Sequence, residues 1–305
     1  MTFRRPFPSA LFTCASIMFV VFSSTIVLGA ELKQQTIKAW NDYLNAAEAS
    51  PNVRMLGQTP FLWVDAVPDR SRRVRAGQII VAPAYKHMPK RVPGGLIHDW
   101  IGAVFIPGAH AEDVLRVIRD YPEYKQFYRP TIVDSAAIDI PSATARNEDR
   151  FSVRFLNRSV LSKTAFDADY AASYVQSGPG MWYSVGYTTR LREIRNYGKS
   201  EQRELPPGEG HGYIWRLYTV TRLAEKDGGV YMEVEAIALS RDIPISLRWV
   251  AVPIVRRVCR DAISTSLVQT EDAVRAAIAR QNRGRTPVNT LTSIAGSSPS
   301  SGRSK

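Results

Sequence analysis

Cysteine and histidine are scarce in this sequence, which has two cysteines and four histidines among 305 residues. Cys14 lies in an N-terminal apolar stretch, so the rest of the chain holds only Cys259, and a single thiol cannot form an internal disulfide. The histidines, at positions 87, 98, 110 and 211, have no metal-ligand spacing such as i, i+4, and no cysteine lies beside them. The sequence therefore predicts neither a disulfide nor a metal site, and Cys259 is interpreted as a small buried apolar residue on a helix.

Motifs for cofactor binding and nucleophilic catalysis are also missing. The sequence has no Gly-x-Ser-x-Gly elbow. Gly198-Lys199-Ser200 resembles the end of a phosphate-binding loop, but Glu193 stands where the first glycine of that loop would be. The glycines at 208–212 are followed by a strand pattern, whereas a dinucleotide-binding turn opens a helix. We therefore expect no cofactor and assign no catalytic residue; whether the protein is an enzyme stays open, with a binding role favoured.

After the first thirty residues, no apolar run approaches the length that spans a bilayer. At the N-terminus, Arg4 and Arg5 precede a largely apolar stretch at residues 9–27, and Gly29 and Ala30 follow it. This order is typical of a secretory signal peptide. The alternative is an uncleaved anchor formed by residues 9–28, because the stretch is nearly long enough to cross a membrane. We therefore expect a periplasmic or secreted protein, with membrane anchoring as the second possibility.

The charge of the chain is mildly basic outside its two ends. The formal net charge is +12, to which residues 1–30 contribute +2 and residues 283–305 contribute +4, leaving +6 for the part between them. That excess is too small to indicate nucleic-acid binding. It would favour peripheral contact with an anionic membrane surface, and solubility alone explains it equally well. Residues 283–305 are rich in Ser, Thr, Gly and Pro and contain no acid, so a disordered tail is predicted.

The patterning of the remaining chain predicts an α+β domain. Helical spacing marks residues 33–49, 111–120 and 246–281, and Pro253 is expected to kink the last of these helices. The segment 52–91 is interpreted as an irregular basic arm. Runs rich in β-branched and aromatic residues, separated by Gly and Pro turns too short for crossover helices, predict seven antiparallel strands. These strands are residues 96–106, 131–138, 149–156, 164–176, 181–194, 211–223 and 230–240.

The order of these elements resembles the START-related superfamily, which has the helix-grip fold and includes polyketide cyclases and coenzyme-Q-binding proteins (the SRPBCC proteins). Two motifs carry the resemblance: the aromatic segment 121–130, which begins Tyr121-Pro122, and Asp242-Ile243-Pro244 before the last helix. The resemblance covers residues 91–282 and leaves residues 31–90 as an additional N-terminal helix and arm. It implies a curved seven-stranded sheet wrapped around the long C-terminal helix, two short helices after the first strand, and a cavity for a hydrophobic ligand.

Several aromatic and charged side chains are candidates for the cavity lining. Aromatic rings offer broad apolar surface, and Arg216 and Glu235 on neighbouring strands could form a buried pair. The sequence does not tell which strand face points inward, and the interpretation favoured for Glu233 and Glu235 is a solvated convex face. His98 and Asp99 are adjacent on a strand, so they point to opposite faces and are not expected to form a dyad. The candidate cavity residues are Trp100, Tyr183, Arg216, Tyr218, Glu235 and Trp249.

Three functions are compatible with these observations. The favoured one is an exported carrier of a lipid, an isoprenoid quinone or a polyketide-like molecule. The second is a cyclase or dehydratase that uses His98, Arg216 or Glu235 as acid–base groups in the same cavity. The third is a membrane-anchored interaction module, in which the N-terminal stretch is retained.

Overall fold

The structure is a computed structural model that describes residues 32–55, 60–139, 148–158, 163–206, 209 and 214–284. The expected signal segment therefore lies outside the described residues, as does His211. Of the expected tail at residues 283–305, the structure describes only residues 283 and 284, which end the last helix. Within the described ranges no helix combines the length and the apolar character of a membrane span. The elements that follow all belong to this part of the chain.

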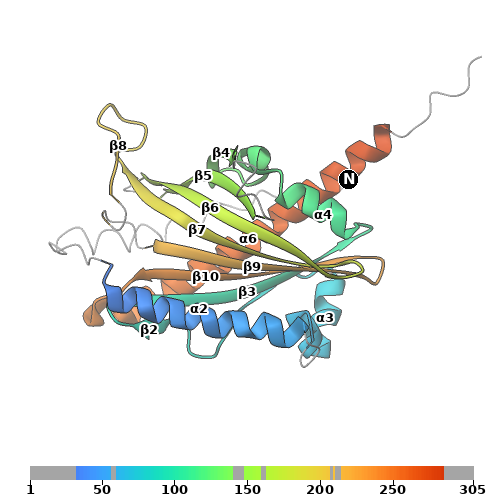
Figure 1. Cartoon of the computed structure of the whole chain (residues 1–305), viewed down its shortest axis with the longest axis horizontal. Helices are drawn as coiled ribbons and strands as arrows, with labels where there is room; N and C mark the ends of the chain where they lie inside the picture. Colours follow the sequence, from blue (N-terminus) through green and yellow to red (C-terminus); the bar gives the residue numbers. More distant parts are fainter. Residues whose placement is uncertain are drawn as a thin grey trace, which may run out of the picture.

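Seven long strands form one curved antiparallel sheet (Figure 1), as the sequence predicts. Their order in the sheet is β3-β10-β9-β7-β6-β5-β4, and the short strands β1 (Ile80–Pro83), β2 (Lys90–Val92) and β8 (Arg203–Glu204) pair with β3 or β7. The observed strand count is therefore ten. The long strands are β3 (Gly95–Pro107), β4 (Ile132–Ile138), β5 (Glu148–Arg158), β6 (Lys163–Gly178), β7 (Met181–Arg195), β9 (Ile214–Lys226) and β10 (Gly229–Arg241).

A two-residue turn shows how the local sequence sets the pairing of β9 with β10. Lys226 pairs with Gly229, so Asp227 and Gly228 alone make the connection. Both have positive φ, 58° and 77°, which is the backbone that a hairpin turn matched to the strand twist requires. An Asp-Gly pair adopts this conformation at low cost, and it sets the register of the two strands as far as Leu239, where the register shifts.

Helices interrupt the strand order after β3 and follow the last strand, as expected. After β3 come α4 (Ala111–Ile118), η3 (Tyr121–Glu123) and α5 (Tyr124–Phe127), and after β10 come η4 (Ile245–Leu247) and α6 (Arg248–Gly284). Pro253 lies inside the first third of α6. α6 crosses one face of the sheet, which we call the inner face (Figure 1). This arrangement, a curved antiparallel sheet around a long C-terminal helix, is the helix-grip fold that the sequence predicts.

α6 lies closest to the sheet at β3. A Cβ atom built on Gly102 would lie 2.6 Å from Cγ2 of Ile263 and 2.9 Å from Cδ1 of Leu267. Trp100 and Val104, which share the face of Gly102, belong to the same buried apolar cluster as these two helix residues. The absence of a side chain at Gly102 therefore permits the close approach that holds α6 against this part of the sheet.

The N-terminal part covers the opposite face of the sheet, which we call the outer face. α2 (Gln34–Met55) buries Trp40 and Tyr43 against Tyr218 and Ile237 of the sheet. The segment expected to be an irregular arm contains η2 (Trp63–Ala66), α3 (Pro68–Arg75), β1 and β2. It is more ordered than expected because it is held by the tertiary structure: β1 and β2 pair with β3, and Val64 and Val74 pack against Phe105.

The contact at Gly102 yields a prediction for stability. Gly102→Ala should lower the free energy of unfolding by about 1–3 kcal/mol, because the added methyl group overlaps Ile263 and Leu267. Urea denaturation measures this change. In a double-mutant cycle with Ile263→Ala, the two substitutions should compensate by about 1 kcal/mol or more. Strictly additive effects would show that Gly102 does not set the distance of the helix from the sheet.

Candidate ligand cavity

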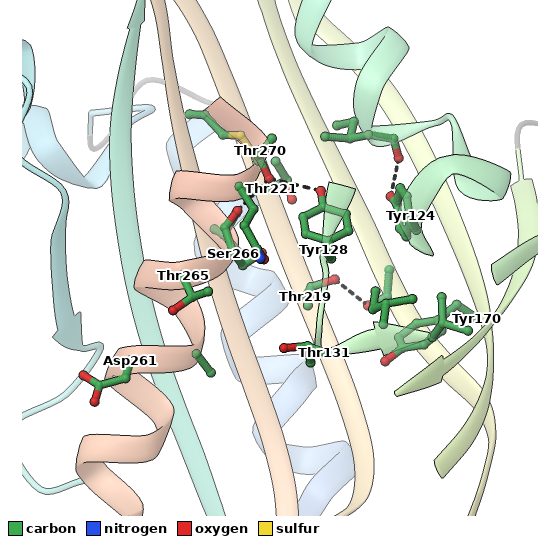
Figure 2. A pocket seen from close by; sticks show the side chains of 18 of the residues that line it. Tyr124, Tyr128, Thr131, Tyr170, Thr219, Thr221, Asp261, Thr265, Ser266 and Thr270 are labelled. Atoms are coloured by element: carbon green, nitrogen blue, oxygen red, sulfur yellow. Dashed lines mark hydrogen bonds between the residues drawn. The ribbon is translucent and has the colours of Figure 1, made fainter. Parts of the chain in front are cut away.

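A cavity of about 750 Å³ lies between the inner face and α6 (Figure 2). Its walls come from the end of α4, from α5 and the residues just after it, from strands β4, β5, β6, β7, β9 and β10, and from residues 253–270 of α6. β3, against which α6 packs tightly, does not contribute to the lining. The volume lies within the range of about 300–1,000 Å³ that is usual for small-molecule sites, so the fold leaves room for a sizeable ligand.

Aromatic side chains build one wall of the cavity. Tyr124 begins the short helix α5 and Tyr128 directly follows it, while Phe151 and Tyr170 come from paired positions of β5 and β6. The rings of Phe151 and Tyr170 stack with centroids 5.1 Å apart, and Tyr121 stacks on the other side of Phe151 at 4.1 Å. Stacked rings give this wall a rigid, broad apolar surface.

Two hydrogen bonds hold the hydroxyl groups of this wall (Figure 2). Tyr124 donates its hydroxyl to the carbonyl oxygen of Ile118 at 2.5 Å, and the hydroxyls of Tyr128 and Thr270 are 3.0 Å apart. Thr270 donates its own proton to the carbonyl oxygen of Ser266, so Tyr128 is the donor to Thr270. This last bond ties the aromatic wall to α6 across the cavity.

The other walls combine apolar side chains with hydroxyl groups. On β9, alternation places Thr219 and Thr221 on the inner face and Val220 and Arg222 on the outer face. Opposite them, β7 contributes Ser184 and Gly186, and Thr219 donates a hydrogen bond to the carbonyl oxygen of Gly186 at 3.2 Å. α6 adds further hydroxyl groups from Thr265, Ser266 and Thr270. Hydroxyl groups donate and accept, so these walls suit a ligand with a few uncharged polar atoms.

Ionised side chains reach the lining only on α6, among the described residues. Arg257 and Asp261 lie one helical turn apart, with the guanidinium 3.6 Å from the carboxylate and side-chain exposures of 58% and 28%. Asp261 also accepts from the Arg260 guanidinium at 3.0 Å, so one carboxylate is shared by two arginines. These partly exposed charges are solvated, which marks this side as the rim of the cavity. The interior is therefore electrically neutral.

Burial keeps the phenol groups of the aromatic wall protonated. It raises the pKa of Tyr124, Tyr128 and Tyr170 above the ordinary value, and the neighbouring tyrosines raise that of Tyr124 further. Burial also raises the pKa of Tyr174 to about 12. Near neutral pH these phenols are therefore neutral and poor proton acceptors. Tyr124 and Tyr128 already donate their only hydroxyl proton within the protein, so towards a ligand each can only accept a hydrogen bond.

The six residues predicted from the sequence lie elsewhere. Trp100 is on the inner face but packs in the solid core under α6, while Trp249 on α6 is 80% exposed. Tyr183 and Tyr218 are on the outer face with α2. None of the six lines the cavity, including Arg216 and Glu235. The residues that do line it, such as Thr219 and Thr221, were missed because both faces of these strands are partly apolar; the aromatic segment after Tyr121 was the available signal.

The expected pair of Arg216 with Glu235 is replaced by another pair. Arg216 stands opposite Leu239, four residues along β10 from Glu235, whereas Glu235 stands opposite Val220 and diagonally across from Arg222. The Arg222 guanidinium donates to Glu235 at 2.8 Å, with side-chain exposures of 2% and 14%. Both glutamates, Glu233 and Glu235, are on the outer face as expected, but that face is covered by the N-terminal elements and Glu233 is fully buried.

The remaining candidates for acid–base chemistry also lie outside the cavity lining. His98 and Asp99 point to opposite faces, as expected: the His98 ring bonds Ser240 at 2.8 Å and Asp99 accepts from Tyr43. Burial lowers the pKa of His98 to about 4, and burial raises the pKa of the Cys259 thiol to about 11. In the part of the chain that the structure describes, no three His, Cys, Asp or Glu side chains gather as metal ligands.

Comparisons with known proteins find similarity in structure. No protein-family model and no curated protein sequence matches the chain. A STAR-related lipid transfer protein fragment from Xanthomonas axonopodis is 17% identical, with a TM-score of 0.40, over 64% of this chain and 98% of that one. Human STARD10 is 11% identical (TM-score 0.42; 70% and 81%), and the Zhui aromatase/cyclase from Streptomyces sp. R1128 is 11% identical (0.37; 62% and 97%). At these identities and scores the neighbours say nothing of this chain's ligand.

The bond between Tyr128 and Thr270 can be tested directly. Tyr128→Phe should lower the free energy of unfolding by about 0.5–1.5 kcal/mol, because a buried hydrogen bond is lost while the ring remains. Thr270→Val supplies the second variant of a double-mutant cycle, measured by urea denaturation. The coupling energy should be about 0.5–1.5 kcal/mol. A coupling energy of zero would mean that the two hydroxyls do not join α5 to α6.

Proposed function

We propose that the protein is an exported carrier that encloses a neutral hydrophobic molecule between the sheet and α6. The observation that carries this proposal is a cavity of about 750 Å³ lined by aromatic rings and uncharged hydroxyls. Export is supported by the basic, apolar and small-residue order of residues 1–30. The function therefore rests on the volume and the neutrality of one site.

The lining favours an uncharged ligand with a small number of oxygen atoms. Moving an ionised group into an apolar interior is costly unless an opposite charge meets it there. Within the described lining, the only ionised side chains are Arg257 and Asp261 at the rim, and they pair with each other. A neutral lipid, an isoprenoid quinone or a polyketide-like molecule fits these conditions, with a ligand oxygen accepting from the Thr221 hydroxyl.

A cyclase or dehydratase is supported less well. Such an enzyme needs a proton donor or acceptor that reaches the bound substrate. His98, Arg216 and Glu235, which were the candidates for that role, do not line the cavity. Its phenols are held protonated by burial, so they would make weak bases near neutral pH. The observations therefore favour a carrier over an enzyme.

Exposed apolar side chains at the start of α6 support contact with an anionic membrane. Ile245 is 77% exposed, Trp249 80% and Val258 55%, and Val258 also borders the cavity. Arg257 and Arg260 lie on the same helix, with exposed fractions of 58% and 54%. Tryptophan inserts at the headgroup level while arginine attracts anionic lipid, so the ligand would enter from this side.

Filling the cavity tests the carrier proposal. Thr221→Trp should weaken binding of a neutral lipid or quinone at least about tenfold, because the indole occupies the ligand volume. Binding is measured by native mass spectrometry of the purified protein and by titration with a panel of such molecules. Thr189→Trp, at an exposed position, is the matched control and should bind as the wild type does. Unchanged binding by a folded Thr221→Trp variant, or no binding by the wild type, would exclude the carrier function.

The membrane proposal has a separate test. Replacing Ile245 and Trp249 together by Ser should reduce binding to vesicles rich in phosphatidylglycerol about tenfold, because two exposed anchors are lost. Vesicle flotation measures the bound fraction. The control is Tyr85→Ser, which removes another exposed aromatic ring far along the chain. If both variants and the wild type float equally, the start of α6 is not the element that contacts the membrane.

A further inference from the structure

Three carboxylates are buried on the outer face of the sheet, beneath the N-terminal elements. Asp99 on β3 and Glu233 on β10 are both 0% exposed, and the Glu235 side chain is 14% exposed. Arg222 on β9, 2% exposed, is the one buried guanidinium that bonds to this group in the described structure. We call these four residues the outer cluster. The outer cluster has three carboxylates and one cation. The partners of each carboxylate therefore decide which of them binds a proton.

Two of the three carboxylates are compensated. Glu233 accepts hydrogen bonds from the backbone N–H groups of Trp63 and Val64, both at 2.8 Å, where η2 begins. Glu235 accepts from Arg222 at 2.8 Å. Each of these carboxylates therefore has donors that stabilise its ionised form.

Asp99 has less compensation. Its Oδ2 accepts a hydrogen bond of 2.6 Å from the Tyr43 hydroxyl of α2, and its buried Oδ1 has no hydrogen-bond partner in the described structure. A carboxylate ionised in this position carries a buried charge without a cation of its own, which costs free energy that a bound proton removes. Burial and the negative charge of Glu235 raise the pKa of Asp99 to about 7, against the smaller opposing effects of Tyr43 and Arg222.

The groups that face Asp99 come from each element packed on it. Tyr43 comes from α2, Glu235 from β10 and Arg222 from β9. Tyr85 contributes to raising the pKa of Tyr43, and the Lys90 ammonium lies 5.0 Å from the centre of the Tyr43 ring. Burial raises the pKa of Tyr43 far above its ordinary value, so Tyr43 keeps its proton and Asp99 is the group that titrates.

We propose that α2 is a proton-linked clamp, held on the outer face by the contact of Tyr43 with a protonated Asp99 and loosened when Asp99 ionises. Release of α2 would uncover Tyr218, Val220 and Ile237, which are buried in the same apolar cluster as Trp40 and Tyr43. Val220 lies between Thr219 and Thr221, which line the cavity, so the clamp acts on the back of the cavity wall. The proposal goes beyond ligand carriage and does not depend on the identity of any ligand.

The direction of the pH effect follows from the two protonation states. With α2 released, Asp99 is solvated and its pKa returns towards the ordinary value of about 3.9. With α2 docked, its pKa is about 7. The docked state therefore binds more protons between about pH 4 and about pH 7, and docking weakens through that window by at most about tenfold per pH unit. Above the docked-state pKa both states are ionised and the loss is complete.

Hydrogen exchange of the full-length mature protein tests the clamp. After correction for intrinsic exchange rates, the amides of α2 should lose protection at least about tenfold between about pH 5 and about pH 7.5. The amides of β6 (Lys163–Gly178) should keep theirs. Constant protection of α2 would overturn the proposal, and so would an equal loss in β6, since that would mean that the proton stabilises the whole fold.

Substitutions assign the effect to Asp99. Asp99→Asn resembles the protonated acid in shape and charge, so α2 should stay protected at both pH values, with a difference of less than about twofold. Asp42→Asn, at an exposed position of the same helix, should retain the wild-type change. Tyr43→Phe should lower the protection of α2 at both pH values and keep its pH dependence. If Asp99→Asn folds and exchanges with the wild-type pH dependence, Asp99 is not the switch; if it does not fold, the wild-type measurement still decides.

Discussion

The close packing of α6 on β3 is the constraint on which the site depends. At Gly102 the strand has no side chain, so Ile263 and Leu267 come nearly into contact with its backbone. α6 is long and the sheet is curved, so a helix held this tightly at β3 does not fill the space over the strands beyond it. The cavity lies there, over β5, β6, β7, β9 and β10. The tight packing of α6 on β3 is therefore the condition for the cavity on the other side of α6.

The sheet separates two chemical environments along the same strands. On β9 and β10 alternate residues face the cavity or the N-terminal cover, so that Thr221 and Val234 line the cavity while Arg222 and Glu235 pair behind it. Charge on the outer face is permitted because the N-terminal elements supply donors to it, including two backbone N–H groups to Glu233. On the inner side, the Asp149 carboxylate of β5 is not among the lining residues and accepts from Arg119, and the ionised side chains of the lining, Arg257 and Asp261, are at the rim. The neutrality of the cavity interior thus depends on the outward orientation of Arg222 and Glu235 on β9 and β10.

The N-terminal elements serve the fold in a different way from α6. α2 is anchored by apolar packing, by the hydrogen bond of Thr36 to the Pro93 carbonyl and by that of Tyr43 to the buried Asp99, while β1 and β2 extend the sheet by pairing with β3. An anchor that includes an incompletely compensated carboxylate is sensitive to protons, whereas the packing of Ile263 and Leu267 on Gly102 is not. α2 on the outer face and α6 on the inner face therefore differ in their response to pH.

The sequence by itself determined the order and the approximate limits of the long strands and of the last helix, since periodicity and turn residues are local properties. The aromatic segment beginning at Tyr121, now one wall of the cavity, was also visible as a motif. Only the tertiary structure decided which face of each strand is inner, because Thr219 and Tyr218 stand in equally apolar company along the chain. It also decided that Arg222 and not Arg216 pairs with Glu235, because that depends on the register set across the Asp227-Gly228 turn. The order within residues 60–92 depends on pairing with a distant strand, a long-range contact that no local pattern encodes.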